Sequence, residues 1–355
     1  MKLYDLPLWA LDNPRGFPET GYQGAGWKIV APEVPHTRSD TFLTPHFKAT
    51  RKKYPHYATM HLSIVDQPNQ SVRIAPQVKL IAPSRLAAQS VFELLRACIS
   101  VMDGNVLRDN DEGIVVPANR RRLEDLSEQD LSDAVVNTLA IDGVGLAAKL
   151  ATRVSRSRSL SYALYKLKMS YNIASTHHVE LNPYYNPKKY SVTKFRFQHV
   201  ILSTAITAAY SAIEEMQLEP RPIKNKPVKE ANGDWNVDAY TDLVTRLTKA
   251  HVDLSKGISW NIRGSVTRVH KSKRAPKGTK LPWTKGIVRD KQVKLEDALV
   301  SASWLRSKCT THRYGAETAS ITMFDVANVQ NLARRLLLER IKVWGDIFKT
   351  RDRRL

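Results

Sequence analysis

Arg306 and His312 are the two residues of this chain whose types and spacing best suit a chemical reaction. Five residues separate them, which is close enough for both side chains to reach one polar site. A guanidinium offers a planar fork of donors to phosphoryl oxygens, and an imidazole with an unperturbed pKa of about 6.5 exchanges a proton near neutral pH. Together they are suited to cleaving a phosphodiester bond.

Spacing alone does not select this pair, because a similar spacing recurs at Arg51–His56 and at Arg263–His270. The first of these contains Pro55, and the second falls in a basic stretch that contains glycine. Arg306 and His312 instead lie in the link between two predicted helices. We therefore take them as the candidate catalytic pair, with Ser307 beside the arginine.

The residues around the pair resemble the pattern of the HEPN superfamily, in which an arginine is followed after four to six residues by a histidine. His312 is followed by Arg313, Tyr314 and Gly315, and then by Ile321 and Asp325 at the start of the last predicted helix. One residue departs from the pattern. Ser307 stands where the family usually has Asn, Asp or His, although a hydroxyl also donates and accepts hydrogen bonds.

The resemblance covers about residues 159–348, and it implies a helical bundle that cleaves RNA without a metal ion or cofactor. Arg306, Ser307 and His312 would be the catalytic residues, and two copies of the chain would form a homodimer with their motifs facing each other. Many such proteins are toxins or antiphage effectors, which implies a regulatory or antitoxin partner. The contexts of Cys98 and Cys309 suggest reduced thiols and thus a cytoplasmic location.

The charge of the chain points independently to a polyanionic partner. Its formal net charge is +21, of which the segment 263–294 carries +10 from eleven Lys or Arg residues and one Asp. Five Gly and Pro residues predict that this basic insertion is irregular, and Trp260 and Trp283 offer faces for stacking bases. The predicted RNA-binding residues are Lys271, Lys273, Arg274, Lys277, Lys280, Trp283, Lys285, Arg289, Lys308 and Arg313.

Hydrophobic periodicity predicts an α+β chain in three parts: a mixed domain at 1–110, a helical bridge with basic patches at 111–158, and a mainly helical domain at 159–355. The resemblance described above implies that this last domain is HEPN-like. In the first part we expect strands at 26–31, 57–65 and 72–81, the last interrupted by Pro76, and a helix from Ser84 to near Gly104. In the bridge we expect a helix over 123–140. The glycines of 143–149 predict a helix start and not a phosphate loop.

From residue 159 onward the pattern predicts only helices. They include a helix marked by Leu160 to Tyr171, and others at 195–216, 236–250 and 293–305. A last helix follows Thr322 and Asp325, whose spacing is typical of a capping box. Glu214 and Glu215 end the second of these helices. We interpret them as solvated charges, with support of the candidate site as the alternative.

Several classes of protein are disfavoured by composition. No run of 18 or more apolar residues exists, no signal peptide is evident at the start, and two cysteines without matched histidines do not predict a zinc site. The endoribonuclease hypothesis has two rivals. One is a non-catalytic protein that binds nucleic acid, and the other is a structural protein that packages nucleic acid with its positive charge.

Overall fold

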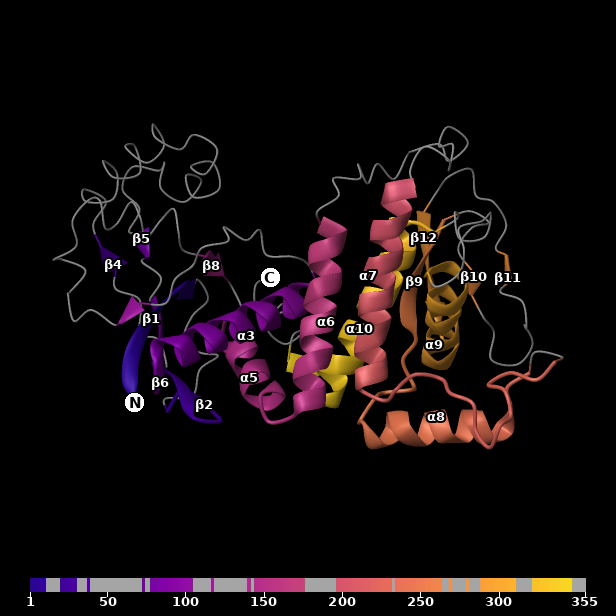
Figure 1. Cartoon of the computed structure of the whole chain (residues 1–355), viewed down its shortest axis with the longest axis horizontal. Helices are drawn as coiled ribbons and strands as arrows, with labels where there is room; N and C mark the ends of the chain where they lie inside the picture. The colour runs from indigo at the N-terminus through magenta and orange to yellow at the C-terminus, as the bar shows by residue number, and fades with distance from the viewer. Residues whose placement is uncertain are drawn as a thin grey trace. The chain divides into compact units, whose positions relative to one another are not determined.

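The chain divides into two compact units, Met1–Ile99 with Leu107–Arg156, and Ser100–Val106 with Ser157–Leu355. The computed structural model describes residues 1–10, 20–30, 37–38, 72–73, 77–104, 116–117, 139–141, 144–175, 196–231, 234–263, 268–269, 279–280, 288–310 and 321–346. Its elements combine a small, mainly antiparallel sheet with a largely helical remainder (Figure 1), which confirms the predicted α+β class at this level.

The sheet of the first unit has the order β2-β3-β6-β1-β7. Its strands are β1 (Lys2–Ala10), β2 (Tyr22–Gly24), β3 (Trp27–Val30), β6 (Gln77–Ala82) and β7 (Val116–Pro117), and β8 (Leu139–Ile141) pairs with β1 in parallel. The pairing of β1 with β6 changes register between Asp5 and Trp9, across the position of Pro7, which has no amide proton for the ladder. This central strand was absent from the sequence-based prediction.

Several predictions for this unit are confirmed. Strands β5 (Val72–Arg73, paired with β4, Thr37–Arg38) and β6 flank Pro76. Helix α3 (Arg85–Asp103) begins after Ser84, whose hydroxyl accepts from the Ala87 N–H at 3.2 Å, and it ends at Gly104 with φ +68°. Helix α5 (Val144–Val154) starts where the glycines predicted a helix.

Two other predictions for this unit have different outcomes. The predicted helix over 123–140 is wrong at its end, because Leu139 and Ala140 belong to β8. The predicted strand at 57–65 lies outside the described residues.

The second unit is built on α6 (Arg158–Ser175), α7 (Arg196–Glu215) and α10 (Met323–Arg340). Helices α6 and α7 are antiparallel, since the Ser159 hydroxyl donates to the Glu215 carbonyl and the Ser170 hydroxyl to the Ala205 carbonyl. The Gln330 amide of α10 donates to the Ser170 hydroxyl at 2.9 Å. The helices bury apolar stripes that include Leu164, Leu167, Ile206, Ala209, Ile213, Val329, Leu332 and Leu336.

Capping residues set the starts of two further helices. Asn236 accepts from the Ala239 N–H at 3.2 Å and begins α8 (Val237–Lys249). The capping box of Thr322 and Asp325 is present at the start of α10, as predicted. Helix α9 (Leu295–Trp304) is buried at every residue from Leu295 to Ala302, and it precedes α10 in the chain.

The prediction that only helices follow residue 159 is wrong. Strands β9 (Ile258–Arg263) and β12 (Val288–Val293) form an antiparallel ladder, and β10 (Arg268–Val269) pairs with β11 (Thr279–Lys280). The basic insertion is therefore not irregular throughout. Its five Gly and Pro residues all fall outside the four strands, and Ile258, Trp260 and Val293 alternate as buried residues of the first ladder.

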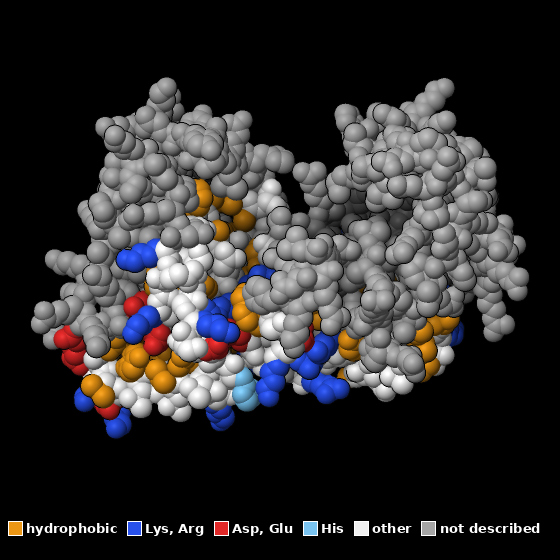
Figure 2. All heavy atoms as spheres, turned by 180° about the vertical axis from the view of Figure 1, so that it is seen from behind, with side chains coloured by type: hydrophobic (Ala, Val, Ile, Leu, Met, Phe, Trp, Pro, Cys, Tyr) orange, Lys and Arg blue, Asp and Glu red, His pale blue; other side chains and the backbone are white. Residues whose placement is uncertain are grey.

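The described surface is polar and basic in several places. Figure 2 shows Lys and Arg side chains scattered over the described face that it presents, in keeping with the net charge of +21. Among the described helices, none combines the length and the hydropathy that crossing a membrane would require.

Candidate functional site

Arg306 lies on a single π-helical turn, Leu305–Thr310, that directly continues α9. Such turns are rare and are often found at functional sites, because they carry one side chain out of the regular helical register. Side chains from within the turn and from α7 hold it in place. The Thr310 hydroxyl donates to the Arg306 carbonyl at 2.5 Å, and the Thr207 hydroxyl of α7 donates to the Thr310 oxygen at 3.1 Å.

The guanidinium of Arg306 is only partly coordinated. Its Nη2 lies 3.4 Å from Oε1 of Glu214, and its buried Nε has no hydrogen-bond partner among the residues that the structure describes. The side chain is 40% exposed, so part of the guanidinium faces solvent. An ion pair at this exposure contributes about 0–1 kcal/mol. The contact with Glu214 therefore orients Arg306 without using its capacity to bind an anion.

Glu214 is itself held by its own helix. The Ser211 hydroxyl donates to its Oε2 at 3.4 Å, while Oε1 faces Arg306. The interpretation of Glu214 as a solvated charge is therefore wrong. Its neighbour Glu215 also has a partner, because the Lys166 ammonium of α6 lies 2.6 Å from its Oε1.

Tyr210, one turn before Glu214 on α7, is buried beside this pair. Burial raises the pKa of its phenol well above the usual value, a hydrogen bond with Ser303 of α9 opposes that rise, and Glu214 and Glu219 add to it. Tyr210 therefore stays neutral at physiological pH. It serves as a polar contact between α7 and α9.

These residues form a surface that can take an anionic oxygen. Arg306 supplies donors, Glu214 fixes their direction, and the π-helical turn is tied to α7 through Thr207. Ser307 lies on the same turn, where its hydroxyl donates to the Trp304 carbonyl at 3.3 Å. In the described part of the chain, no three His, Cys, Asp or Glu residues cluster in a way that would hold a metal ion.

The predicted site residues fall into three groups. Arg306 and Ser307 are described on the π-helical turn, with the backbone of Lys308 between Ser307 and Thr310. Lys280 and Arg289 lie in β11 and β12. The rest lie outside the described residues: Lys271, Lys273, Arg274, Lys277, Trp283, Lys285, His312 and Arg313.

The prediction that Trp260 offers a face for base stacking is wrong. The Trp260 side chain is fully buried, and it lies in β9 opposite Lys291 of β12. Its position at the base of the ladder makes it a core residue, so Trp283 is the one tryptophan left for stacking in the basic insertion.

A further Arg–His pair, Arg246 and His251, has four intervening residues and shows what a similar spacing means in a structural setting. Arg246 donates to Asp242 at 2.8 Å, to the Glu219 carbonyl at 2.9 Å and to the Gln217 carbonyl. His251 follows α8 in the left-handed region, with φ +61°. The donors of this arginine hold α8 against the segment that follows α7, in contrast to those of Arg306.

Sequence reasoning missed Thr207 and Tyr210. Thr207 lies three residues before Tyr210 on α7, and Tyr210 lies four residues before Glu214, so the three residues share one side of this helix. That polar interval on a buried helix is the signal that could have identified them.

Comparison of the chain with protein-family models, with curated proteins and with solved structures finds no significant match. The geometry of the site is thus the basis for its function.

Proposed function

We propose that the chain is a metal-independent endoribonuclease in which Arg306 and His312 act on one phosphodiester. The observation that carries this proposal is the partial coordination of Arg306. Within the described part of the chain, its Nε has no partner, its one ionic contact is 3.4 Å long, and its side chain is 40% exposed. Buried polar atoms normally have partners. A guanidinium left with free donors on a π-helical turn is suited to a phosphoryl group.

The residues support a transfer reaction whose atoms balance. The ribose 2′-oxygen forms a bond to the adjacent phosphorus while the bond from phosphorus to the 5′-oxygen breaks. His312 takes the proton of the 2′-hydroxyl, and an imidazolium returns a proton to the leaving 5′-oxygen. Arg306 stabilises the negative charge that builds on the phosphoryl oxygens. The products are a 2′,3′-cyclic phosphate and a 5′-hydroxyl.

Glu214 is a positioning residue in this scheme. It does not reach the reacting atoms in our proposal, but it fixes the direction of the Arg306 fork. The resemblance to HEPN proteins supports the same roles for Arg306, Ser307 and His312, and it supports a homodimer in which two motifs face each other. A toxin or antiphage role, and control by a regulatory partner, follow from the resemblance alone.

The test is cleavage of a mixed RNA substrate by the purified full chain in the presence of EDTA. We expect cleavage that leaves cyclic phosphate ends, and a rate loss of about 10²–10⁴-fold in His312→Ala, the usual contribution of general acid–base catalysis. Arg306→Ala should lose a comparable factor, because removing one donor to a developing charge costs about 10²–10³-fold.

Matched controls are available in the same unit. Arg221 is 42% exposed and lies 3.3 Å from Asp242, so Arg221→Ala removes an arginine of nearly the same exposure and pairing as Arg306. His251→Asn replaces an exposed histidine and retains a residue that tolerates its positive φ. Both controls should keep full activity. Equal activity in His312→Ala, Arg306→Ala and the two controls would refute the assignment.

The expected homodimer has its own measurement. Light scattering at micromolar concentration should give twice the mass of 40.2 kDa in active samples. An active sample of monomeric mass would contradict the dimer while leaving the catalytic residues in place.

A further inference from the structure

Helix α6 carries three exposed apolar side chains along one side. Tyr162, Tyr165 and Met169 are 56%, 43% and 57% exposed, whereas Tyr171 of the same helix is 3% exposed. Their spacing of three and four residues places them one above the other on the helix surface. We call these three residues the tyrosine stripe. Of the aromatic side chains that the structure describes, its two tyrosines are the most exposed.

The opposite side of α6 is fixed in the core of the second unit, where it packs against α7 and α10 (Figure 1). The apolar residues buried on that side are Ala163, Leu164, Leu167, Tyr171 and Ala174. The Ser170 hydroxyl donates to the Ala205 carbonyl of α7 at 2.7 Å and accepts from the Gln330 amide of α10 at 2.9 Å. The tyrosine stripe is therefore presented on a rigid support, which lowers the entropic cost of binding a ligand.

The sequence around the tyrosine stripe is basic. Segment 143–179 contains six Lys or Arg residues and neither Asp nor Glu. Three of the six lie on α6 itself. Arg158 is exposed and stands four residues before Tyr162, on the same side of the helix. Lys166 and Lys168 follow Tyr165 by one and three residues, so the helical period places them on the two flanks of the stripe. The aromatic faces are thus surrounded by cations.

Lys166 also connects this surface with the candidate site. Its ammonium lies 2.6 Å from Oε1 of Glu215, which balances part of its charge. The preceding residue of α7, Glu214, is the ionic partner of Arg306. Adjacent residues of a chain are about 3.8 Å apart at their Cα atoms. The flank of the tyrosine stripe and the π-helical turn are therefore tied to neighbouring positions of α7, within reach of one nucleic-acid strand.

Exposed aromatic faces among cations match the chemistry of a single-stranded nucleic acid. Its bases stack on aromatic side chains, and its phosphates are attracted to Lys and Arg. The rise of an α-helix separates Tyr162 from Tyr165 by about 4.5 Å, and Tyr165 from Met169 by about 6 Å. The stacked bases in one strand of a duplex are about 3.4 Å apart. The tyrosine stripe therefore fits a strand whose bases are drawn apart and not a duplex.

Two other partners fit the tyrosine stripe less well. A second copy of the chain would bring the cations of two α6 helices together, and like charges that meet across an interface cost free energy. A membrane surface takes up the apolar face of a helix that lies in it. The apolar face of α6 is already packed against α7 and α10. The charge and the packing of α6 thus favour a nucleic-acid strand over both.

We propose that the tyrosine stripe binds a single-stranded segment of RNA, with bases stacked on Tyr162 and Tyr165 and with phosphates near Arg158 and Lys168. This inference rests on the proposed function for the choice of RNA over DNA. It adds the form of the substrate and a binding surface outside the π-helical turn. Because every base has a face that can stack, the stripe positions the strand without selecting its sequence.

The test is binding of the full chain to a labelled 2′-O-methyl RNA strand of mixed sequence, about 12 nucleotides long, followed by fluorescence anisotropy. The methyl group removes the nucleophile, so binding is measured whether or not the chain cleaves RNA. The single strand should bind more tightly than a duplex of the same sequence, because paired bases do not offer their faces for stacking.

The decisive variant is Tyr162→Ala with Tyr165→Ala. Stacking of a base on an aromatic ring contributes about 1–3 kcal/mol, so each lost ring should weaken binding about 5–150-fold, with little change in salt dependence. The matched control is Tyr162→Phe with Tyr165→Phe, which keeps both rings and should keep the affinity. Alanine is a strong helix former, so the decisive variant should not melt lower than the unmodified chain.

Two further variants separate charge from stacking. Arg158→Gln with Lys168→Gln should flatten the slope of log affinity against log salt by about 1.4, because each neutralised phosphate of a single strand contributes about 0.7. Leu86→Ala with Val237→Ala removes exposed apolar side chains from α3 and α8. This control should bind RNA like the unmodified chain.

Four outcomes would overturn the proposal. Unchanged RNA affinity in Tyr162→Ala with Tyr165→Ala would remove the tyrosine stripe from the interface. A dimer that becomes a monomer in this variant, with its RNA affinity kept, would show that the stripe joins two copies of the chain. Duplex RNA bound as tightly as the single strand would refute the preference for single strands, and single-stranded DNA bound more tightly than RNA would refute RNA as the partner. Each result is independent of cleavage, so the proposed function and this inference fail separately.

Discussion

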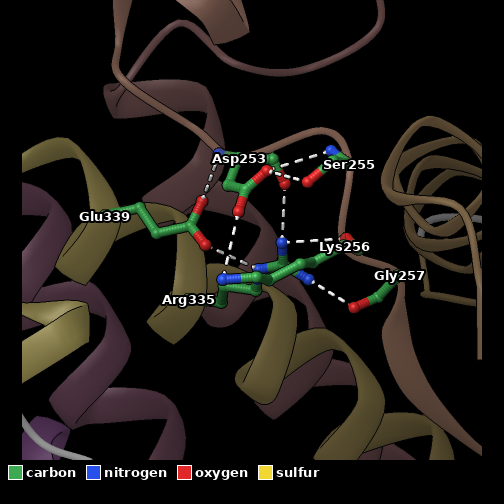
Figure 3. A network of polar contacts seen from close by, with 6 residues as sticks. All are labelled: Asp253, Ser255, Lys256, Gly257, Arg335 and Glu339. Carbon is green, nitrogen blue, oxygen red and sulfur yellow. Dashed lines mark hydrogen bonds and ion pairs between the residues drawn. The ribbon is translucent and has the colours of Figure 1, made fainter.

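Arg306 and Arg335 lie in the same unit and each contacts one glutamate, yet their surroundings are opposite. The Arg335 side chain is 5% exposed and donates to one carboxylate and three backbone carbonyls, as Figure 3 shows. The Arg306 side chain is 40% exposed. Among the described residues it has one ionic contact, at 3.4 Å, and no hydrogen-bond partner for its Nε.

The difference separates an arginine that holds the fold from one that is available to a ligand. Burying a guanidinium costs free energy unless its charge is paired and its donors are bonded. Arg335 meets this requirement within the protein. Arg306 is less desolvated, and its remaining donors can bind an anion without first breaking a strong internal interaction.

The largest expected effect is on stability, from Arg335→Ala. The substitution leaves Glu339 buried without its partner and removes the donors that hold three carbonyls of the turn before β9. Breaking a buried pair from one side typically costs about 3–5 kcal/mol of unfolding free energy. Urea denaturation should show this loss.

Arg306→Ala is the matched comparison, because it should change the unfolding free energy by about 1 kcal/mol or less. If the two variants were equally destabilised, Arg306 would also be a structural arginine, and its assignment as an anion-binding residue would be wrong.

The next effect is a loss of cleavage rate in variants of Glu214, the ionic partner of Arg306. Misplacement of a reacting group by about 1 Å can cost about 10²-fold in rate, so Glu214→Ala should lower the cleavage rate by up to that factor. Glu214→Gln keeps an oxygen that accepts from Arg306, and it should recover most of the rate. Steady-state RNA cleavage measures both. Equal losses in the two variants would mean that the negative charge of Glu214, and not its position, is needed.

A smaller effect on stability is expected at Asn261 of β9, whose backbone is bound by Asn328 of α10. Asn328→Ala removes both partners of the Asn261 backbone, and an unsatisfied buried polar group costs about 1–3 kcal/mol. In the Asn328→Ala variant, hydrogen exchange at the Asn261 amide should speed up relative to the unmodified chain by more than exchange at the amides of α7. Unaltered protection at Asn261 would mean that α10 does not anchor this strand.

Much of the fold follows from local rules. The starts of α3, α8 and α10 were predictable because Ser84, Asn236 and Thr322 are capping residues followed by apolar periodicity. Strands β9 to β12 were not predictable in this way, because they are short and each pairs with a strand that is distant in sequence. The number of Gly and Pro residues characterises segment 263–294 as a whole, whereas the strands lie in the stretches between these Gly and Pro residues.

The candidate site was predicted only in part, for a related reason. Arg306 and Ser307 were found from spacing, whereas Glu214 is 92 positions away and meets Arg306 through the packing of α7 against the turn after α9. No local pattern distinguishes a glutamate that faces solvent from one that faces an arginine. Trp260 was misassigned in the same way, since an aromatic side chain in a basic segment does not by itself reveal whether it is buried.

Two aspartates extend the comparison of satisfied and unsatisfied groups to acids. Asp325 at the start of α10 accepts from the N–H and the hydroxyl of Thr322, and burial raises its pKa to about 6. Asp297 in the first turn of α9 has a buried Oδ1 without a hydrogen bond. Burial raises its pKa to about 7. The Lys229 and Lys294 charges oppose that rise, and Glu296 adds to it.

The smallest expected effect is a pH-dependent gain of stability in Asp297→Asn. In the folded chain the carboxyl keeps its proton up to a pH of about 7, whereas in the unfolded chain it loses it near a pH of about 4. The unfolding free energy of the unmodified chain therefore falls as pH rises through this window. Asparagine cannot ionise, so the variant should melt higher than the unmodified chain at a pH of about 8, and this difference should shrink steadily as the pH is lowered to about 4. The expected gain is about 2–4 °C, which corresponds to about 1 kcal/mol in a unit of this size. Asp325→Ala should instead melt lower at pH of about 5, because it loses a cap worth about 0.5–2 kcal/mol. A melting difference for Asp297→Asn that does not change with pH would show that this carboxyl is ionised throughout, with a partner that satisfies it.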